Sequence, residues 1–140
     1  AYAVGAEAEI EDMPGYLPLQ QNAPLSDLFA QNARTLLPDA CIEQGLPFCG
    51  STDMGDLSYL LPVIQPTVNG FTGALHSRDF AVTDKALAYL VPAKLLAMTA
   101  IDLLAGDAAI AQRICRDFPR KTIEAYRQLW DDLLCEADAL

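Results

Sequence analysis

Residues 85–104 are the feature that most constrains how this chain folds, because they form a run at helical spacing that is apolar on almost every side. Its apolar members are Ala86, Leu87, Leu90, Val91, Leu95, Leu96, Ala97, Ile101, Leu103 and Leu104. A helix with this pattern needs other elements around most of its surface. We therefore expect residues 85–104 to be the buried spine of the fold. Pro92 lacks a backbone N–H, so a kink is expected near Ala88 or Tyr89.

Other helices are expected before and after this spine. Ser26 is predicted to cap a helix that Pro38 ends. Gly106 is predicted to close the spine, and a further helix is expected over residues 107–118. Residues 121–137 have the pattern of an amphipathic helix. The packing face of this last helix would consist of Ile123, Tyr126, Leu129, Trp130, Leu133 and Leu134.

Strands are predicted to be few and short. Residues 6–11 alternate between apolar and acidic side chains, which is typical of a half-buried strand with one wet face. Residues 63–65 follow a proline and are apolar enough for a short buried strand, and Cys41 and Ile42 are a weaker candidate. Together with the helices, these segments indicate a mixed α/β chain.

Composition limits the classes of function. The chain has 140 residues, slightly more than half of them apolar, which suffices for one domain or part of a larger one. A net charge of −10 disfavours nucleic acid and anionic membranes as partners, since both require clustered Lys and Arg. No apolar run approaches the ~20 residues of a membrane span. Four cysteines without metal-ligand spacing are expected to be reduced, buried thiols of a cytoplasmic protein: Cys41, Cys49, Cys115 and Cys135.

The candidate site lies in residues 50–77, a polar, glycine-punctuated stretch between apolar segments, where binding and catalytic groups usually occur. It contains the only histidine, His76, and a cluster of small polar and acidic residues. The cluster includes Ser51, Thr52, Asp53 and Asp56. A lone histidine is more often structural than a ligand, so these residues do not by themselves define a chemistry.

Helix capping is an alternative explanation for the acidic residues at two predicted helix starts. Asp53 is a good N-cap for a short helix over 54–61, and Asp56 could bond back to it as in a capping box. The pair could instead hold a cation, but capping is the commoner reason for such spacing. Thr83 or Asp84 is expected to cap the spine in the same way.

Two segments carry a family resemblance. GSTDMGDLSYLLPVIQP (50–66) and HSRDFAVTDKALAYLVPAKLLAMTAIDLL (76–104) resemble the C-terminal part of the dinuclear-metal amidohydrolases, which include aminoacylase and succinyl-diaminopimelate desuccinylase. The p-aminobenzoyl-glutamate hydrolase branch is the most similar, because aminoacylase-type members carry Glu-Asp where this chain has Thr52-Asp53. EAEIEDMPGYLPL (7–19) resembles the exit strand of that family's lid domain.

The resemblance implies a fold. Residues 1–22 would be the end of an inserted α+β lid domain, including its last strand, and the hinge after it. Residues 23–140 would be the C-terminal part of a zinc-exopeptidase-like, three-layer catalytic domain with mostly helices and a few short strands. The opening residues also read as the last turn of a helix ended by Gly5. The chain is therefore expected to be a fragment whose main partner is the remainder of its own polypeptide, in a homo-oligomer.

The resemblance also implies a chemistry. Family members bind two divalent ions, Zn or Mn, and hydrolyse the amide bond of N-acyl amino acids, small peptides or aminobenzoyl-glutamate-like substrates with a metal-activated water. His76 matches the family's final metal ligand, and Ser51, Thr52, Asp53 and Asp56 would shape the substrate loop. The other ligands and the glutamate base precede the lid in the family. The 140-residue chain alone is thus expected to be inactive and to hold no metal.

Two alternatives remain open at this point. The chain could come from a catalytically dead homologue that serves as a binding or assembly module. It could also be a small free-standing α/β domain in which His76 is only structural. An HxD-type ligand and a Glu-Glu pair upstream in a longer sequence would favour the enzyme over both.

Overall fold

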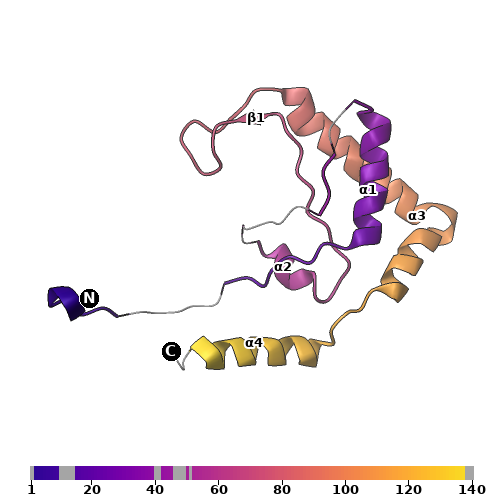
Figure 1. The fold of residues 1–140 in the computed structure, drawn as a ribbon. Coiled ribbons are helices and arrows are strands. Elements are labelled where there is room, and N and C mark those ends of the chain that lie inside the picture. Colours follow the sequence, from indigo (N-terminus) through magenta and orange to yellow (C-terminus); the bar gives the residue numbers. More distant parts are fainter. Residues whose placement is uncertain (1, 10–14, 40–41, 46–49, 51, 138–140) are drawn as a thin grey trace.

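The computed structural model describes residues 2–9, 15–39, 42–45, 50 and 52–137 (Figure 1). The described chain is mostly helical with one small two-stranded antiparallel sheet, a mixed α/β class in the coarse sense. In order, its elements are a 3₁₀-helix (Tyr2–Val4), α1 (Ala23–Leu36), α2 (Met54–Leu57), β1 (Phe71–Thr72), β2 (Ala81–Val82), a π-helix (Ala86–Leu90), α3 (Val91–Asp117) and α4 (Ile123–Ala137).

Helix α1 begins earlier than predicted. Asn22 is its N-cap, and the Asn22 side chain accepts a hydrogen bond from the Leu25 backbone N–H at 3.0 Å. Pro24 fits in the first turn because the N–H it lacks has no helical partner there. Ser26 therefore lies inside the helix, and its prediction as the cap is wrong. The predicted end is confirmed, since α1 stops at Leu36, just before Pro38.

The core of the molecule is the contact between α1 and α3. Ala30 and Ala33 of α1 and Leu95 of α3 are buried, and the small alanines let the two helices approach closely. A polar cluster lies in the same contact. The Asn32 side-chain amide donates to Asp102 Oδ2 at 2.8 Å and to Thr99 Oγ1 at 3.3 Å. These bonds satisfy the buried amide and fix how the helices are aligned.

The turn before α3 is distorted, at the position where the sequence predicted a kink caused by Pro92. Asp84 caps the start, because its side chain accepts from the Leu87 N–H at 2.9 Å, which confirms one of the two predicted caps. The chain then forms a π-helix, Ala86–Leu90, in which the Val91 N–H bonds to the Ala86 carbonyl. Since Pro92 has no N–H to donate into the preceding turn, the wider π turn absorbs the missing bond.

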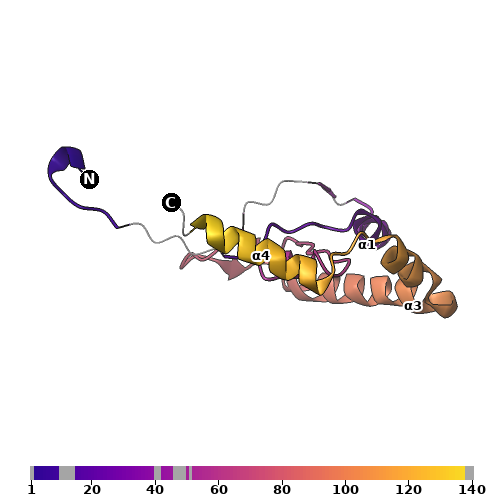
Figure 2. The ribbon, with the colours of Figure 1, turned by 90° about the horizontal axis from the view of Figure 1, so that it is seen from below.

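The prediction that this helix is buried on most sides is wrong for the described chain. Leu95 is 1% exposed, but Leu96 is 62% and Ile101 67% exposed. Figures 1 and 2 show why: the elements spread out in one view and form a thin layer in the other, and of the described helices it is α1 that packs along α3. The accessible surface is 10740 Å². A compact monomer of 15.1 kDa has roughly 7,000 Å².

The long apolar helix also bears on the membrane question. Residues 86–117 are long and apolar enough, by length and composition alone, to cross a membrane. This differs from the expectation drawn from the sequence. Such a helix is weak support for a membrane span, because core helices of other proteins have the same composition. The helix is also interrupted: Gly106, Asp107 and Ala108 all have positive φ, so α3 consists of two helical parts joined by a kink at the predicted Gly106 break.

The predicted strands are not formed in the described residues. Residues 6–9 are exposed and lie in no strand. Ile42 is half-buried and also lies in no strand, and the remaining residues of both candidates are outside the described ranges. Residues 63–65 form an extended segment instead, and the Val63 carbonyl accepts from the Asn22 N–H at 2.9 Å. A strand needs a neighbour to pair with, and no described segment lies in register with either. At the start, Tyr2–Val4 is helical and Gly5 has φ +70°, as predicted.

The cysteine prediction is wrong at two positions. Cys115 and Cys135 are unpaired but exposed, so they are not core thiols in the described chain. Cys41 and Cys49 lie outside the described residues. The amphipathic face of α4 is half-covered: Tyr126, Leu129, Trp130 and Leu133 are partly buried, whereas Ile123 and Leu134 are exposed.

Candidate functional site

Residues 71–82, at the end of the predicted site stretch, form a β-hairpin. Phe71 of β1 pairs with Val82 of β2, and Thr72 pairs with Ala81. The rings of Phe71 and Phe80 stack with centroids 5.2 Å apart, which stiffens the base of the hairpin. Gly73 has φ +80°, and a Cβ there would lie 2.4 Å from the Asp79 carbonyl oxygen. Only glycine fits where the two sides of the hairpin approach so closely.

His76 lies in the turn of this hairpin. Its φ is +62°, a left-handed conformation that histidine adopts more readily than most residues but still at a cost. The next residue fixes the turn, because Ser77 donates both its N–H and its hydroxyl to the Ala74 carbonyl, at 3.1 and 2.6 Å. The imidazole is exposed, and within the described chain no hydrogen bond engages it.

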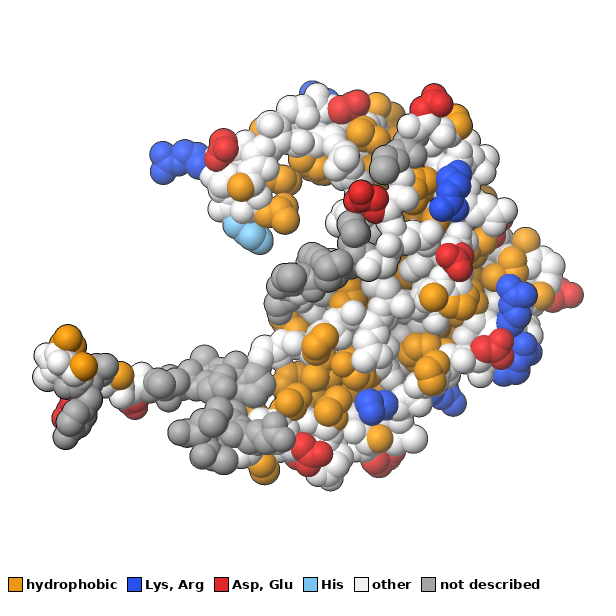
Figure 3. All heavy atoms as spheres, in the orientation of Figure 1, with side chains coloured by type: hydrophobic (Ala, Val, Ile, Leu, Met, Phe, Trp, Pro, Cys, Tyr) orange, Lys and Arg blue, Asp and Glu red, His pale blue; other side chains and the backbone are white. Residues whose placement is uncertain are grey.

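The surroundings of His76 are open. In Figure 3 the pale blue side chain of the single histidine lies on the rim of a hollow beside the hairpin. Leu75, next to it, is also largely exposed. An exposed imidazole on a strained turn at the edge of a hollow is accessible to a ligand. In the part of the chain that the structure describes, no group of three or more His, Cys, Asp or Glu side chains could hold a metal ion.

The acidic segment around α2 is built differently from the prediction. Helix α2 is a single turn, Met54–Leu57, instead of a helix reaching residue 61. Asp53 is exposed and makes no capping bond; the Thr52 hydroxyl accepts from the Met54 N–H instead, at 3.4 Å. Ser51 lies outside the described residues. The predictions of Asp53 as a cap and of Asp56 as the reciprocal partner are therefore wrong, since neither carboxylate bonds to the helix start.

The Asp56 carboxylate instead bonds to α4. Oδ1 of Asp56 accepts from the Tyr126 hydroxyl at 2.8 Å and from the Trp130 indole N–H at 3.1 Å. The indole N–H also lies 2.8 Å from the Tyr126 hydroxyl oxygen, so the three groups form a closed triangle. Burial, followed by the hydrogen bond to Asp56, raises the pKa of Tyr126 above its ordinary value, although the bond from Trp130 opposes the increase. We call these three residues the acid–aromatic triad.

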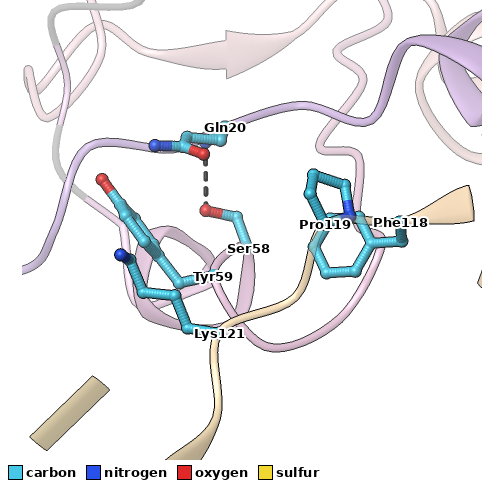
Figure 4. A pocket seen from close by; sticks show the side chains of 6 residues that line it. All are labelled: Gln20, Ser58, Tyr59, Phe118, Pro119 and Lys121. Atoms are coloured by element: carbon cyan, nitrogen blue, oxygen red, sulfur yellow. Dashed lines mark hydrogen bonds between the residues drawn. The ribbon is translucent and has the colours of Figure 1, made fainter. Parts of the chain in front are cut away.

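The other side of the α2 segment faces residues 17–20. Gly55 is buried so close to this strip that a Cβ would lie 1.8 Å from the Leu17 carbonyl oxygen. Ser58 is also buried, and its hydroxyl accepts from the Gln20 N–H at 3.0 Å. A cavity of about 290 Å³ opens beside it (Figure 4). Its walls are Gln20, Ser58, Tyr59, Phe118, Pro119 and Lys121.

The structure does not join the two halves of the predicted site. Figure 1 shows the hairpin well apart from α2, and the described partners of Asp56 are Tyr126 and Trp130, so the turn that carries His76 does not meet the acidic segment. Sequence reasoning placed Tyr126 and Trp130 on a packing face but missed their bond to Asp56. Their spacing of four residues, with two polar atoms on one helical face, was the available signal.

Comparisons of the chain with known protein families, with curated proteins and with solved structures gave no match. Function is therefore inferred from the residues and their geometry.

Proposed function

We propose that this chain forms part of a metal-dependent amidohydrolase and that His76 supplies one ligand of its metal site. Substrates would be N-acyl amino acids, small peptides or aminobenzoyl-glutamate-like amides. The observation that carries the proposal is His76 itself: an exposed imidazole without a described protein partner, held on a strained hairpin turn. The motif resemblance around residues 50–66 and 76–104 supports the same reading.

The described residues fit such a metal only in part. A catalytic zinc takes about three protein ligands, and within the described ranges no cluster of that size exists. His76 would contribute one nitrogen, and the remaining ligands and the general base would come from protein outside these residues. Bound divalent ions supply the charge that brings the pKa of a water molecule toward neutrality. The role left to this chain is to present the imidazole from a rigid turn.

A second feature supports assembly with further protein. Beyond Leu96 and Ile101, large apolar side chains of the spine are exposed at Tyr89, Leu90 and Leu104. An exposed apolar surface on a helix whose opposite face is buried is typical of a protein–protein contact surface. We propose that the remainder of the same polypeptide covers this surface of α3. The opposite face of α3 already packs against α1, where Asn32 donates a hydrogen bond to Asp102.

The test is metal content and amide hydrolysis of the intact protein, with His76→Gly as the central variant. Glycine is the right replacement, because it accepts the positive φ and so removes the imidazole without straining the turn. The variant is expected to lose most activity and the rise in melting midpoint that metal causes, while the metal-free protein melts as before. Leu75→Ala, on the same turn, is the control and should retain both.

The alternatives give different results in the same experiment. A catalytically dead homologue would hydrolyse no amide at any metal concentration. A structural histidine would give unchanged kinetics and full metal occupancy in His76→Gly, and this outcome would overturn the proposal. For the 140-residue chain alone, calorimetric titration with Zn²⁺ or Mn²⁺ is expected to show weak binding or none.

A further inference from the structure

Helix α4 is attached to the rest of the molecule in an unusual way. It follows a short extended linker after α3 and lies beside α2 (Figures 1 and 2). Among the described residues, every side-chain hydrogen bond that α4 makes outside itself and its own first turn ends on Asp56. The other polar link nearby is the Lys121 N–H, which donates to the Tyr59 carbonyl at 2.8 Å in the linker. In its described side-chain hydrogen bonds, the docking of α4 therefore depends on a single carboxylate.

That carboxylate lies in the middle of the segment that the sequence singled out. Asp56 is in the single turn of α2, directly after Thr52 and Asp53. The segment is fixed on its other side by the close approach of Gly55 to Leu17 and by the bond from Gln20 to Ser58. One helical turn is too short to be stable by itself. Contacts from both sides are therefore what hold its conformation.

We propose that α4 is a clamp on the acidic segment and that Tyr126 and Trp130 are positioning residues, which act through Asp56. Each donates a hydrogen bond to the same carboxylate oxygen, and the indole N–H also bonds to the tyrosine hydroxyl. Bonds to a charged acceptor are stronger than neutral ones. The two rings sit one helical turn apart on α4, and both side chains and Asp56 are partly buried, which strengthens the hydrogen bonds between them.

The clamp also has a consequence for the cavity beside Ser58. Three of its walls, Phe118, Pro119 and Lys121, belong to the linker that leads into α4, and two others, Ser58 and Tyr59, follow α2 directly (Figure 4). Release of α4 would leave the bond from the Lys121 N–H to the Tyr59 carbonyl as the one described hydrogen bond between these two walls. The cavity is thus expected to change shape when the triad is broken.

The chain has a built-in probe for this clamp, because Trp130 is its only tryptophan. Asp56→Asn removes the negative charge but retains the shape of the side chain. This change should shift the docking equilibrium of α4 about tenfold toward release, the effect of losing a charged acceptor. The tryptophan emission maximum of the full chain should move to longer wavelength. Trypsin cleavage after Arg127, within α4, should be about tenfold faster, because cleavage tracks the population of the open form.

A matched control lies on the same helix. Asp132 accepts a hydrogen bond from Gln128 at 2.8 Å, but both side chains are exposed and the bond stays within α4. Asp132→Asn changes the net charge by the same amount as Asp56→Asn and should leave emission and cleavage unchanged. Tyr126→Phe, which removes one hydroxyl, should give a smaller change in the same direction as Asp56→Asn. It also keeps the test decisive if Asp56→Asn fails to fold, as judged by circular dichroism.

The effect on catalysis rests on the proposed function, whereas the clamp itself does not. In the intact protein, Tyr126→Phe and Asp56→Asn should raise KM several-fold with a smaller change in kcat, because the segment would bind substrate while His76 is untouched. If the intact protein hydrolyses no amide, the proposed function falls, and emission and cleavage still decide the clamp. If both variants match Asp132→Asn in emission and cleavage, the clamp is overturned. A confirmed clamp with wild-type kcat and KM would overturn the positioning role.

Discussion

Leu95 and Leu96 are neighbours in α3, yet the side chain of Leu95 is 1% exposed against α1 and that of Leu96 is 62% exposed on the other side of the helix. The two residues have the same side chain and helix propensity, so any difference between them in the cost of substitution reflects burial alone. Comparing their alanine variants therefore shows which face of the spine is covered.

Leu95→Ala should lower the free energy of unfolding of the 140-residue chain by about 2–5 kcal/mol, the usual cost of a large core truncation. Leu96→Ala should change it by less than about 0.5 kcal/mol, as at an exposed site. Urea melts of both variants check this. In the intact protein Leu96→Ala should become costly if the remainder of the polypeptide covers that face. Equal costs for both leucines in the 140-residue chain would contradict the observed burial.

The second prediction concerns the polar cluster between α1 and α3. Asp102→Ala removes the acceptor 2.8 Å from the buried Asn32 amide and should cost about 1–3 kcal/mol, the penalty of an unsatisfied buried donor. Asp117→Ala is the control. Within the described ranges its carboxylate pairs with Arg116, at 3.1 Å on the surface, and such pairs contribute about 0–1 kcal/mol. A double-mutant cycle with Asn32→Ala should show coupling, and additive effects would contradict a direct interaction.

The third prediction follows from the left-handed conformation of His76. Replacement by glycine should change the metal-free stability by less than about 0.5 kcal/mol, because relief of the strained φ offsets the greater freedom of the unfolded chain. Valine at the same position should cost about 1–2 kcal/mol, since a β-branched side chain is poorly tolerated in this conformation. Thermal melts of the metal-free variants give the order. A valine variant as stable as the glycine variant would exclude a left-handed turn at this position.

The fourth prediction is a pH dependence from Tyr126. Its pKa is raised in the folded chain by burial and by the hydrogen bond to Asp56, so the folded state holds the phenol proton more tightly than the unfolded state. The stabilisation is fully present below the ordinary tyrosine pKa of about 10. It is lost as the pH rises through the higher folded pKa. Other groups titrate in this range, so the quantity to measure is the difference between wild type and Tyr126→Phe from pH 8 to 11. A difference that is independent of pH would refute the prediction.

Local signals in the sequence predicted local structure well. Pro38, Gly106 and Pro92 end, break or distort helices where their backbone chemistry requires it, and Asp84 caps the helix that follows it. The cap at Asn22 was missed because both Asn22 and Ser26 have suitable side chains. The position of Pro24 in the first turn decides between them.

Contacts between distant residues were not accessible to the same reasoning. Asp56 and its partners are separated by 70 and 74 residues, and nothing in the spacing of acidic residues near a helix start indicates a remote aromatic pair. The predicted strands failed for a related reason, because a strand is specified by its neighbour as much as by its own alternation. His76 remains a prediction as a metal ligand, and the structure adds its left-handed conformation and its exposure.

Because α3 is covered on one face and exposed on the other, copies of the chain can associate with one another. A net charge of −10 makes copies repel one another in dilute buffer, while the uncovered leucines and isoleucine attract at short range. Salt at about 0.1 M shortens the range of the repulsion to about 10 Å and leaves the attraction intact. The 140-residue chain should therefore stay dispersed at low ionic strength and associate as salt is added.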